Sequence, residues 1–327
     1  MNVRTPFDQL PQALVEELEV AGLDARAVYA AVVSAVEEDL PGGAEDVTSA
    51  ATIPADARGA ADFAAREVGV VAGLGVAALV FAHVLGEDAS VSDRVADGTR
   101  VEAGDVVMRV SGKTRGLLTA ERTALNFASH LSGVATATSH WVAALEGTRA
   151  RVLDTRKTLP NLRMLEKYAV RCGGGVNHRF SLCDMAMVKD NHVIAAGGVV
   201  PAFLAVRASQ PDLPVEVEVT DLDQLRELLD VGCERILLDN MTDDQMAEAV
   251  GIREGHATPA TLEASGGLTL ERARGVAETG VDFISVGALT HSVLVLDLGM
   301  DLSPHTPLIQ QGARSAHASA GTPKDLR

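Results

Sequence analysis

The chain is poor in aromatic residues, in cysteine and in positive charge, and each shortage argues against a class of function. Aromatic side chains make up 3% of its 327 residues, so the stacking platforms of single-strand nucleic-acid binders would be hard to assemble. The formal net charge of −17 removes the broad positive surface that non-specific nucleic-acid binding needs. We therefore expect no nucleic-acid partner.

The three cysteines show no CxxC spacing and cannot all pair, which indicates a reducing compartment and structural thiols. The N-terminus lacks the cationic start and apolar core of a signal peptide. The most apolar run, residues 68–85, is interrupted by glycines and a histidine and is too short to span a membrane. We expect a cytoplasmic protein without a membrane partner.

The length is typical of one large or two medium domains, and the first part is expected to be mixed α and β. Residues 11–37 have helical apolar spacing. Residues 59–68 and 106–112 are predicted strands, bounded by glycine-containing turns, and the first 120 or so residues favour an antiparallel sheet. A long helix or helix pair is predicted over residues 119–145, with Thr119 as its N-cap.

After residue 150, short apolar strands alternate with helical stretches, which is typical of a parallel sheet. The predicted strands cover residues 151–155, 185–189, 214–219, 235–239, 261–265 and 282–286. Six strands are fewer than the eight of a complete barrel. A complete barrel, an irregular or incomplete α/β barrel and a doubly wound layer all remain open from this pattern. The polar tail after Pro304 is expected to be disordered.

Positive charge is concentrated in residues 151–189, a segment that we call the cationic segment. It holds eight Lys and Arg against three Asp and Glu, so it carries +5 while the rest of the chain carries −22. Such clustering in an acidic protein indicates a pocket for a small, multiply charged anion.

Each predicted parallel strand ends in polar residues or glycine. The strand ends are Thr155-Arg156-Lys157, Lys189-Asp190, Glu218, Asp239-Asn240, Ser265-Gly266-Gly267 and Ser285-Val286-Gly287. In α/β barrels the carboxyl ends share one mouth, where the active site lies. We therefore expect Arg156, Lys157, Arg179 and Lys189 to line one site, with His178 beside them. The alternative is a solvated basic face.

We expect Glu218 and Asp239 to be the only acidic strand residues that face these cations. Carboxylates in this setting suit a divalent metal ion or sugar hydroxyls. The alternative is a pair of ion bridges to Lys157 or Lys189. The two glycine-containing strand ends could hold a phosphate through backbone amides at helix N-termini.

Several motifs together resemble the quinolinate phosphoribosyltransferase family, over about residues 10–302. The motifs are Glu38-Asp39-Leu40, Asp46-Val47-Thr48, ERTALN at 121–126, DTRKT at 154–158, GGG at 173–175 with Asn177-His178-Arg179, KDNH at 189–192, EVEV at 216–219, Leu238-Asp239-Asn240 and EASGG at 263–267. The resemblance implies that quinolinate and phosphoribosyl pyrophosphate give nicotinate mononucleotide, pyrophosphate and carbon dioxide, with Mg²⁺.

The resemblance also implies an architecture: an N-terminal α/β sandwich domain (1–124, with a return of about 292–304), an irregular α/β barrel with parallel strands (125–291) and a tail (305–327). It implies a homodimer, alone or within a higher oligomer, in which Arg122 enters the partner's site.

The resemblance assigns roles to single residues. Arg156 and Arg179 would bind the quinolinate carboxylates, with His178 and Lys189 beside them and Thr155 at the same strand end. Lys157 would lie near the reacting carbon, and Glu218 and Asp239 would hold ribose hydroxyls and the metal. Ser265, Gly266, Gly267, Val286 and Gly287 would bind the 5′-phosphate.

Three rival functions remain open. A transferase of the same fold could use nicotinate or another pyridine acid, but it would need fewer arginines. A non-catalytic homologue should have lost Glu218, Asp239 or a lysine, and none is missing. A phosphate-binding aldolase or isomerase would place a buried Schiff-base lysine away from carboxylate-binding arginines.

Overall fold

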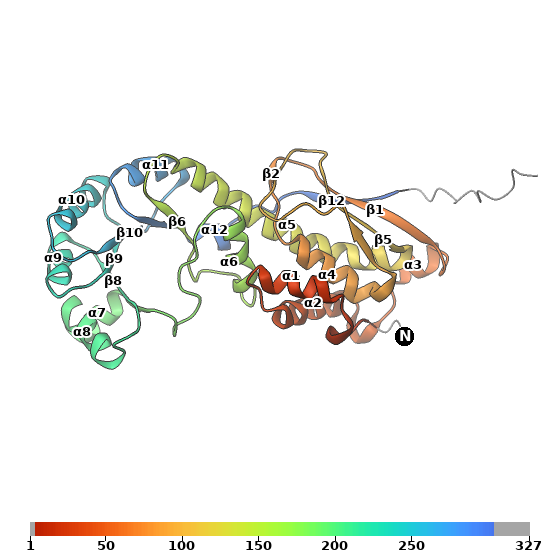
Figure 1. The fold of residues 1–327 in the computed structure, drawn as a ribbon, viewed down its shortest axis with the longest axis horizontal. Coiled ribbons are helices and arrows are strands. Elements are labelled where there is room, and N and C mark those ends of the chain that lie inside the picture. Colours follow the sequence, from red (N-terminus) through yellow and green to blue (C-terminus); the bar gives the residue numbers. More distant parts are fainter. Residues whose placement is uncertain (1–3, 304–327) are drawn as a thin grey trace, which may run out of the picture.

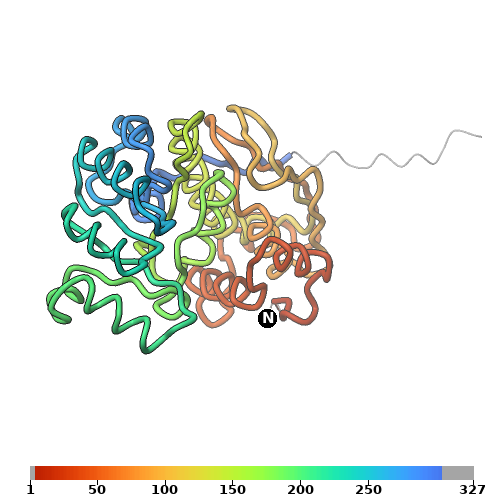
Figure 2. The backbone as a smooth tube through the Cα atoms, turned by 60° about the vertical axis from the view of Figure 1, so that its left-hand side comes forward, coloured from red at the N-terminus to blue at the C-terminus, as the bar shows by residue number. Residues whose placement is uncertain are grey.

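The computed structural model describes residues 4–303 and contains two main sheets joined by one long helix. Figure 1 shows the antiparallel sheet and the first helices on one side and the parallel sheet with its helices on the other, with α5 running between them. Figure 2 shows the red and orange elements on one side and most of the green and blue ones on the other, with the blue β12 (Leu298–Ser303) running to the orange strands. The predicted disordered tail, residues 305–327, lies outside the described residues.

The bounds of the elements are as follows. The α-helices are α1 (Gln12–Val20), α2 (Ala25–Asp39), α3 (Val47–Thr52), α4 (Leu74–Leu85), α5 (Thr114–Ala144), α6 (Arg163–Cys172), α7 (Asp190–Ala196), α8 (Val199–Ser209), α9 (Leu222–Asp230), α10 (Asp243–Glu254), α11 (Leu270–Glu278) and α12 (Ala288–His291). The strands are β1 (Arg58–Ala65), β2 (Gly69–Val70), β3 (Ser90–Ser92), β4 (Arg100–Val101), β5 (Val106–Lys113), β6 (Arg151–Leu153), β7 (Ala186–Val188), β8 (Val215–Val219), β9 (Arg235–Asp239), β10 (Thr261–Ser265), β11 (Phe283–Ser285) and β12 (Leu298–Ser303).

The N-terminal sheet is antiparallel, with the strand order β12-β1-β5-β3. Its last strand comes from the far end of the described chain, since Phe63 of β1 pairs with Met300 of β12. Helix α4 supplies much of the core, and every residue from Leu74 to His83 is buried. The most apolar run of the sequence is thus largely a core helix.

Helix α5 begins at Thr114, so the prediction that it starts at Thr119 with that residue as its N-cap is wrong. Thr119 lies inside the helix, and its hydroxyl is 3.4 Å from Asp46 Oδ2. Gly116 lies in the first turn, where a Cβ would come within 2.7 Å of Leu85 Cγ. The glycine permits close packing against α4 and does not end a helix.

The second sheet is parallel, with the order β6-β11-β10-β9-β8-β7. Its edge strands β6 and β7 do not pair with each other, although Leu153 of β6 forms a parallel bridge with Val176. Helices α8 to α11 alternate with the strands. The structure thus confirms the expected fold class: an irregular α/β barrel with parallel strands beside an N-terminal sheet domain.

The predicted domain boundary between residues 124 and 125 lies within α5, which continues unbroken to Ala144. The boundary stays a prediction. Within residues 4–303, no single helix has the length and hydropathy to cross a membrane; α7 and α8 meet those criteria only together, with a bend of 89°.

Candidate active site

A cavity of about 280 Å³ lies at the carboxyl ends of the parallel strands. It is lined by Thr155, Arg156, Lys157, His178, Arg179, Met187, Lys189, Leu237, Glu263, Ser265 and Ser285. Seven of these were predicted from the sequence as site residues: Thr155, Arg156, Lys157, His178, Arg179, Lys189 and Ser265. The strand ends and the segment before β7 bring them together.

Arg156 and Arg179 lie close enough for their charges to repel. Burial, and then the neighbouring charge of Arg156, lower the pKa of Arg179. The Arg156 Nε atom is buried and has no hydrogen-bond partner among the described residues. The ion pairs described around the cavity involve Lys167, His178 and Lys189 and include neither arginine. Two adjacent guanidinium groups without a carboxylate partner favour binding of an anion.

Lys189 and Glu218 form an ion pair across the ends of β7 and β8. The distance from Lys189 Nζ to Glu218 Oε2 is 2.9 Å, and the lysine side chain is 47% exposed while that of Glu218 is 11% exposed. The sequence left open whether Glu218 binds a metal ion or forms an ion bridge to a lysine, and the structure shows the ion bridge to Lys189. Glu218 itself does not line the cavity.

Lys157 is held at the cavity by its backbone. Its N–H donates to Thr155 Oγ1 at 3.0 Å, and its carbonyl accepts from Thr290 Oγ1 at 2.8 Å. Gly287 lies against its side chain, since a Cβ there would come within 2.9 Å of Lys157 Cδ. The glycine after β11 therefore makes room for the lysine.

The loops after β9 and β10 approach each other closely. Asn240 Nδ2 donates to Asp239 Oδ2 at 2.9 Å. Gly266 has φ +96°, and a Cβ there would come within 2.3 Å of Asn240 Oδ1. This close approach and the positive φ require glycine. Gly267, Val286 and Gly287 do not line the cavity, and the helix after Gly287 has only four residues.

A buried ion pair fixes the segment that carries His178 and Arg179. The Lys167 ammonium group bonds to Asp154 Oδ1, and both side chains are fully buried. Asp154 also accepts from Asn177 Nδ2 at 2.5 Å and from His178 N at 2.8 Å. Lys167 Nζ donates to the His178 carbonyl at 2.9 Å. The His178 peptide groups are therefore held from both sides.

The cavity-lining cations form one surface, which we call the cationic wall: Arg156, Lys157, Arg179 and Lys189. Beside it lies a buried group formed by His178, Glu216 and Glu263, which we call the buried trio. His178 Nε2 lies 2.8 Å from Glu216 Oε2 and 3.4 Å from Glu263 Oε2. Burial opposes a charged ring, but hydrogen bonds and charge from both carboxylates outweigh it and raise the pKa of His178 to about 9. Burial and the nearby charge of Glu216 raise the pKa of Glu263. Such coupled protons belong to the group as a whole.

The expectation that Glu218 and Asp239 are the only acidic strand residues facing the cations is wrong. Glu263 lines the cavity, and Glu216 contacts His178. Strand alternation could have indicated both residues, because side chains two positions apart in a strand point to the same face. Glu216 lies two residues before Glu218, and Glu263 lies two residues before Ser265. The trio's ligand atoms also lie within 4.8 Å of one another, close enough for a metal ion. Glu218 and Asp239, the predicted metal ligands, do not belong to the buried trio.

Arg122 is separate from the cavity in the single chain. It is exposed on α5 and does not line the cavity. Its predicted role in a partner's site stays a prediction.

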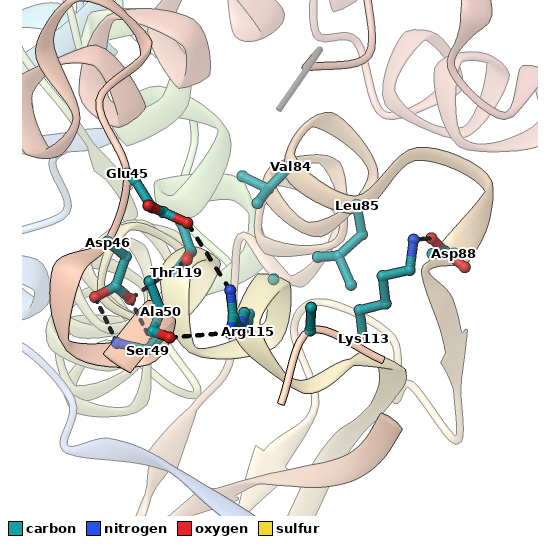
Figure 3. A pocket seen from close by; sticks show the side chains of 12 residues that line it. Glu45, Asp46, Ser49, Ala50, Val84, Leu85, Asp88, Lys113, Arg115 and Thr119 are labelled. Atoms are coloured by element: carbon teal, nitrogen blue, oxygen red, sulfur yellow. Dashed lines mark hydrogen bonds and ion pairs between the residues drawn. The ribbon is translucent and has the colours of Figure 1, made fainter. Parts of the chain in front are cut away.

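A second cavity, of about 360 Å³, lies among α3, α4, the end of β5 and the start of α5 (Figure 3). It contains Asp46 of the predicted family motifs. Asp46 caps α3 by accepting from the N–H groups of Thr48 and Ser49, and Arg115 donates to Ala50 O and Ile53 O. These polar groups already hold the local backbone, so they join α3 to α5.

Comparison with known proteins gives consistent matches over both parts of the chain. The family model "Quinolinate phosphoribosyl transferase, N-terminal domain" matches residues 46–132, and the corresponding C-terminal domain matches residues 134–301. A protein of Mycobacterium leprae named nicotinate-nucleotide pyrophosphorylase [carboxylating] is 53% identical over 269 residues, covering 82% of this chain and 94% of that protein. A mitochondrial quinolinate phosphoribosyltransferase [decarboxylating] of Nicotiana tabacum is 39% identical, covering 87% and 84%.

The solved structures give the same likeness. The nicotinate-nucleotide pyrophosphorylase of Francisella tularensis matches with a TM-score of 0.80 and 36% identity, covering 85% of this chain and 96% of that one. Human nicotinic acid phosphoribosyltransferase matches with a TM-score of 0.55 and 13% identity. At 13% identity, the match to the human protein shows only that the two chains share a fold.

Proposed function

The chain belongs to the quinolinate phosphoribosyltransferase family, and from this premise we propose that it makes nicotinate mononucleotide, pyrophosphate and carbon dioxide from quinolinate and phosphoribosyl pyrophosphate. This reaction is a step of NAD biosynthesis. The observation that carries the proposal is the pair of neighbouring guanidinium groups of Arg156 and Arg179, which form no ion pair within the described residues, in the cavity at the carboxyl ends of the sheet.

The cavity suits a flat dicarboxylate. Met187 and Leu237 supply apolar lining for a pyridine ring, while Arg156 and Arg179 offer forked donors for its carboxylates. Lys157, in the loop after β6, would meet the negative charge that develops on pyrophosphate as it leaves. The chain's residues act here by orientation and charge, with no covalent nucleophile.

Glu218 and Asp239 fit Mg²⁺ by the type of their donors. Both offer carboxylate oxygens, which this ion prefers, at the ends of the adjacent strands β8 and β9. Glu218 keeps its ion pair with Lys189, so its negative charge is already partly balanced. When bound, Mg²⁺ would neutralise pyrophosphate charge. The two carboxylates would also accept hydrogen bonds from the ribose hydroxyls.

We propose the loops after β10 and β11 as the binding site of the ribose 5′-phosphate. Ser265 lines the cavity, and Gly266, Gly267, Val286 and Gly287 follow the two strand ends. Backbone N–H groups and Lys157 beside Gly287 suit a phosphate group.

The active form is proposed to be a homodimer in the cytoplasm. Arg122 is exposed on α5 and outside its own chain's cavity, which is consistent with a role in the partner's site. The three cysteines are all free, as expected in a reducing compartment.

The test is a product assay with purified protein, Mg²⁺, phosphoribosyl pyrophosphate and either quinolinate or nicotinate. We expect nicotinate mononucleotide and pyrophosphate in equal amounts from quinolinate, with one carbon dioxide per turnover. The matched control is Arg226→Ala, an exposed arginine on α9, which should leave the rate unchanged. Product from nicotinate but not from quinolinate would point to the transferase for another pyridine acid and overturn the proposal.

A further inference from the structure

The interior of the barrel holds two acidic side chains that the proposed function does not use. Glu216 and Glu263 are each 3% exposed. Their register partners Met187 and Leu237 are apolar, as a layer inside a barrel normally is. Burying two carboxylates without a functional reason would be unfavourable.

The hydrogen bonds of the buried trio indicate where its protons lie. The Arg179 N–H donates to His178 Nδ1 at 2.7 Å, so this nitrogen accepts and carries no proton. The ring proton is therefore on Nε2 and is donated to Glu216 Oε2 at 2.8 Å. The pKa of about 9 of His178 beside the two carboxylates therefore belongs to the coupled trio, and in this hydrogen-bond arrangement the further proton lies on a carboxyl group.

Glu263 is the carboxyl group that favours the protonated form. Its Oε1 atom is buried and accepts no hydrogen bond of normal geometry among the described residues, although the Ser285 hydroxyl lies nearby. An ionised carboxylate with one unpaired buried oxygen costs more than a neutral one. The groups that face it are His178, Glu216 from β8, Leu237 from β9 and Ser285 from β11. Burial and the charge of Glu216 keep the pKa of Glu263 raised, and they outweigh His178, which lowers that pKa through its hydrogen bond and charge.

The proposed reaction requires a proton donor in the cavity that binds quinolinate. When the C2–carboxylate bond of the N-ribosylated quinolinate breaks, carbon dioxide leaves and the bonding electron pair stays on C2, beside the positively charged ring nitrogen. That carbon then takes up one proton, because the product carries hydrogen where the substrate carried carboxylate. Arg156, Arg179, Lys157 and Lys189 around the cavity are needed as cations for binding.

We propose that Glu263 donates this proton to C2, with His178 and Glu216 as positioning residues that keep Glu263 protonated and aimed at the cavity. The inference rests on the proposed function. The Oε–H bond of Glu263 breaks, a C–H bond forms at C2, and the resulting carboxylate is reprotonated from water when the product leaves. No oxidant or further reactant is needed.

The experiment compares the wild type with Glu263→Gln, which keeps the shape but has no transferable acid proton, and with Glu263→Asp, which keeps an acid one methylene further away. Glu234→Gln, an exposed residue directly before β9 and therefore at the amino end of that strand, is the matched control. Pyrophosphate release and carbon dioxide release are measured separately across pH.

Because carbon dioxide can recombine with the C2 electron pair until that carbon is protonated, we expect net carbon dioxide release to be slowed by about 10²-fold or more in Glu263→Gln. Pyrophosphate release and quinolinate affinity should stay close to wild type. The acid form is active, so the wild-type rate of carbon dioxide release should fall as pH rises, and the glutamine variant should lose this fall. Glu263→Asp should lie between them.

A second readout separates proton donation from a structural effect. In an equal mixture of H2O and D2O, a carboxyl group and a water molecule deliver hydrogen and deuterium to C2 in different proportions. The H:D ratio at C2 of the product should therefore change in Glu263→Gln, where water has to act as the donor. If Glu263→Gln does not fold, Glu263→Asp should still shift the pH-dependent fall. An unchanged ratio with an unchanged pH profile in either variant would overturn the inference. Absence of pyrophosphate from wild type would instead overturn the proposed function.

Discussion

Replacing Lys167 by methionine tests the buried ion pair that supports the site. The side chains of Lys167 and Asp154 are both fully buried. Burial lowers the pKa of Lys167 and raises the pKa of Asp154, so either charge alone would be costly in this place. Each charge is stabilised mainly by the other and by the hydrogen bonds around the pair. Lys167→Met leaves Asp154 with only the donors from Asn177 and His178.

The expected loss is about 3 to 5 kcal/mol, the usual cost of leaving one charge of a buried pair uncompensated. At about 2 to 4 °C per kcal/mol for a domain of this size, the melting temperature should fall by roughly 6 to 20 °C. Asp154→Asn combined with Lys167→Met removes the stranded charge and should recover part of this loss. The exposed control Arg226→Met breaks a pair with side chains 48% and 91% exposed, and should change stability by less than about 1 kcal/mol.

Thermal unfolding followed by circular dichroism measures the stability, and quinolinate saturation measures the site. Lys167→Met should also raise the quinolinate KM, because Lys167 holds the His178 carbonyl. The reasoning is refuted if Lys167→Met melts within about 2 °C of wild type, less than 1 kcal/mol on this scale. It is also refuted if the double variant is less stable than the single one.

Three further predictions concern the proposed reaction. Arg179→Ala should weaken quinolinate binding by about 10- to 100-fold through loss of charged hydrogen bonds and leave phosphoribosyl pyrophosphate binding nearly unchanged; calorimetry showing equal losses would contradict the assigned role. At a quinolinate concentration too low for either variant alone to turn over, a mixture of Arg122→Ala and Arg179→Ala should recover about a quarter of wild-type activity, since half the dimers would hold one complete site; no recovery after subunit exchange would argue against a shared site. Chelation of Mg²⁺ should stop pyrophosphate release without preventing quinolinate binding, and Glu218→Gln should raise the Mg²⁺ concentration needed for half-maximal rate.

The parts of the fold that depend on local periodicity were predictable. Helix α2 buries Val28, Val32 and Val36 at helical spacing, and β9 and β10 match their predicted bounds. The start of α5 was not predictable, because Gly116 has the local signal of a break. Its actual role depends on Leu85, which is distant in sequence.

The same distinction holds for the site. Cations at strand ends could be placed in one cavity because carboxyl ends of parallel strands meet. The burial of Lys167 could not be predicted, since a lysine on an amphipathic helix usually faces water and its partner Asp154 lies on another element. The burial of Glu216 and Glu263 depends on His178 reaching into the barrel from a loop.

The cationic wall and the acidic interior of the barrel are connected through one dipeptide. The Arg179 N–H bonds to the His178 ring, and the ring bonds to Glu216, so the position of the anion-binding guanidinium depends on the protonation of the group beside it. Asp154 and Lys167 hold the His178 backbone from the other side. A second ring proton would have to displace the Arg179 N–H and disturb the wall. Keeping the exchangeable proton on Glu263 therefore allows the site to gain and lose a proton while Arg179 stays in place.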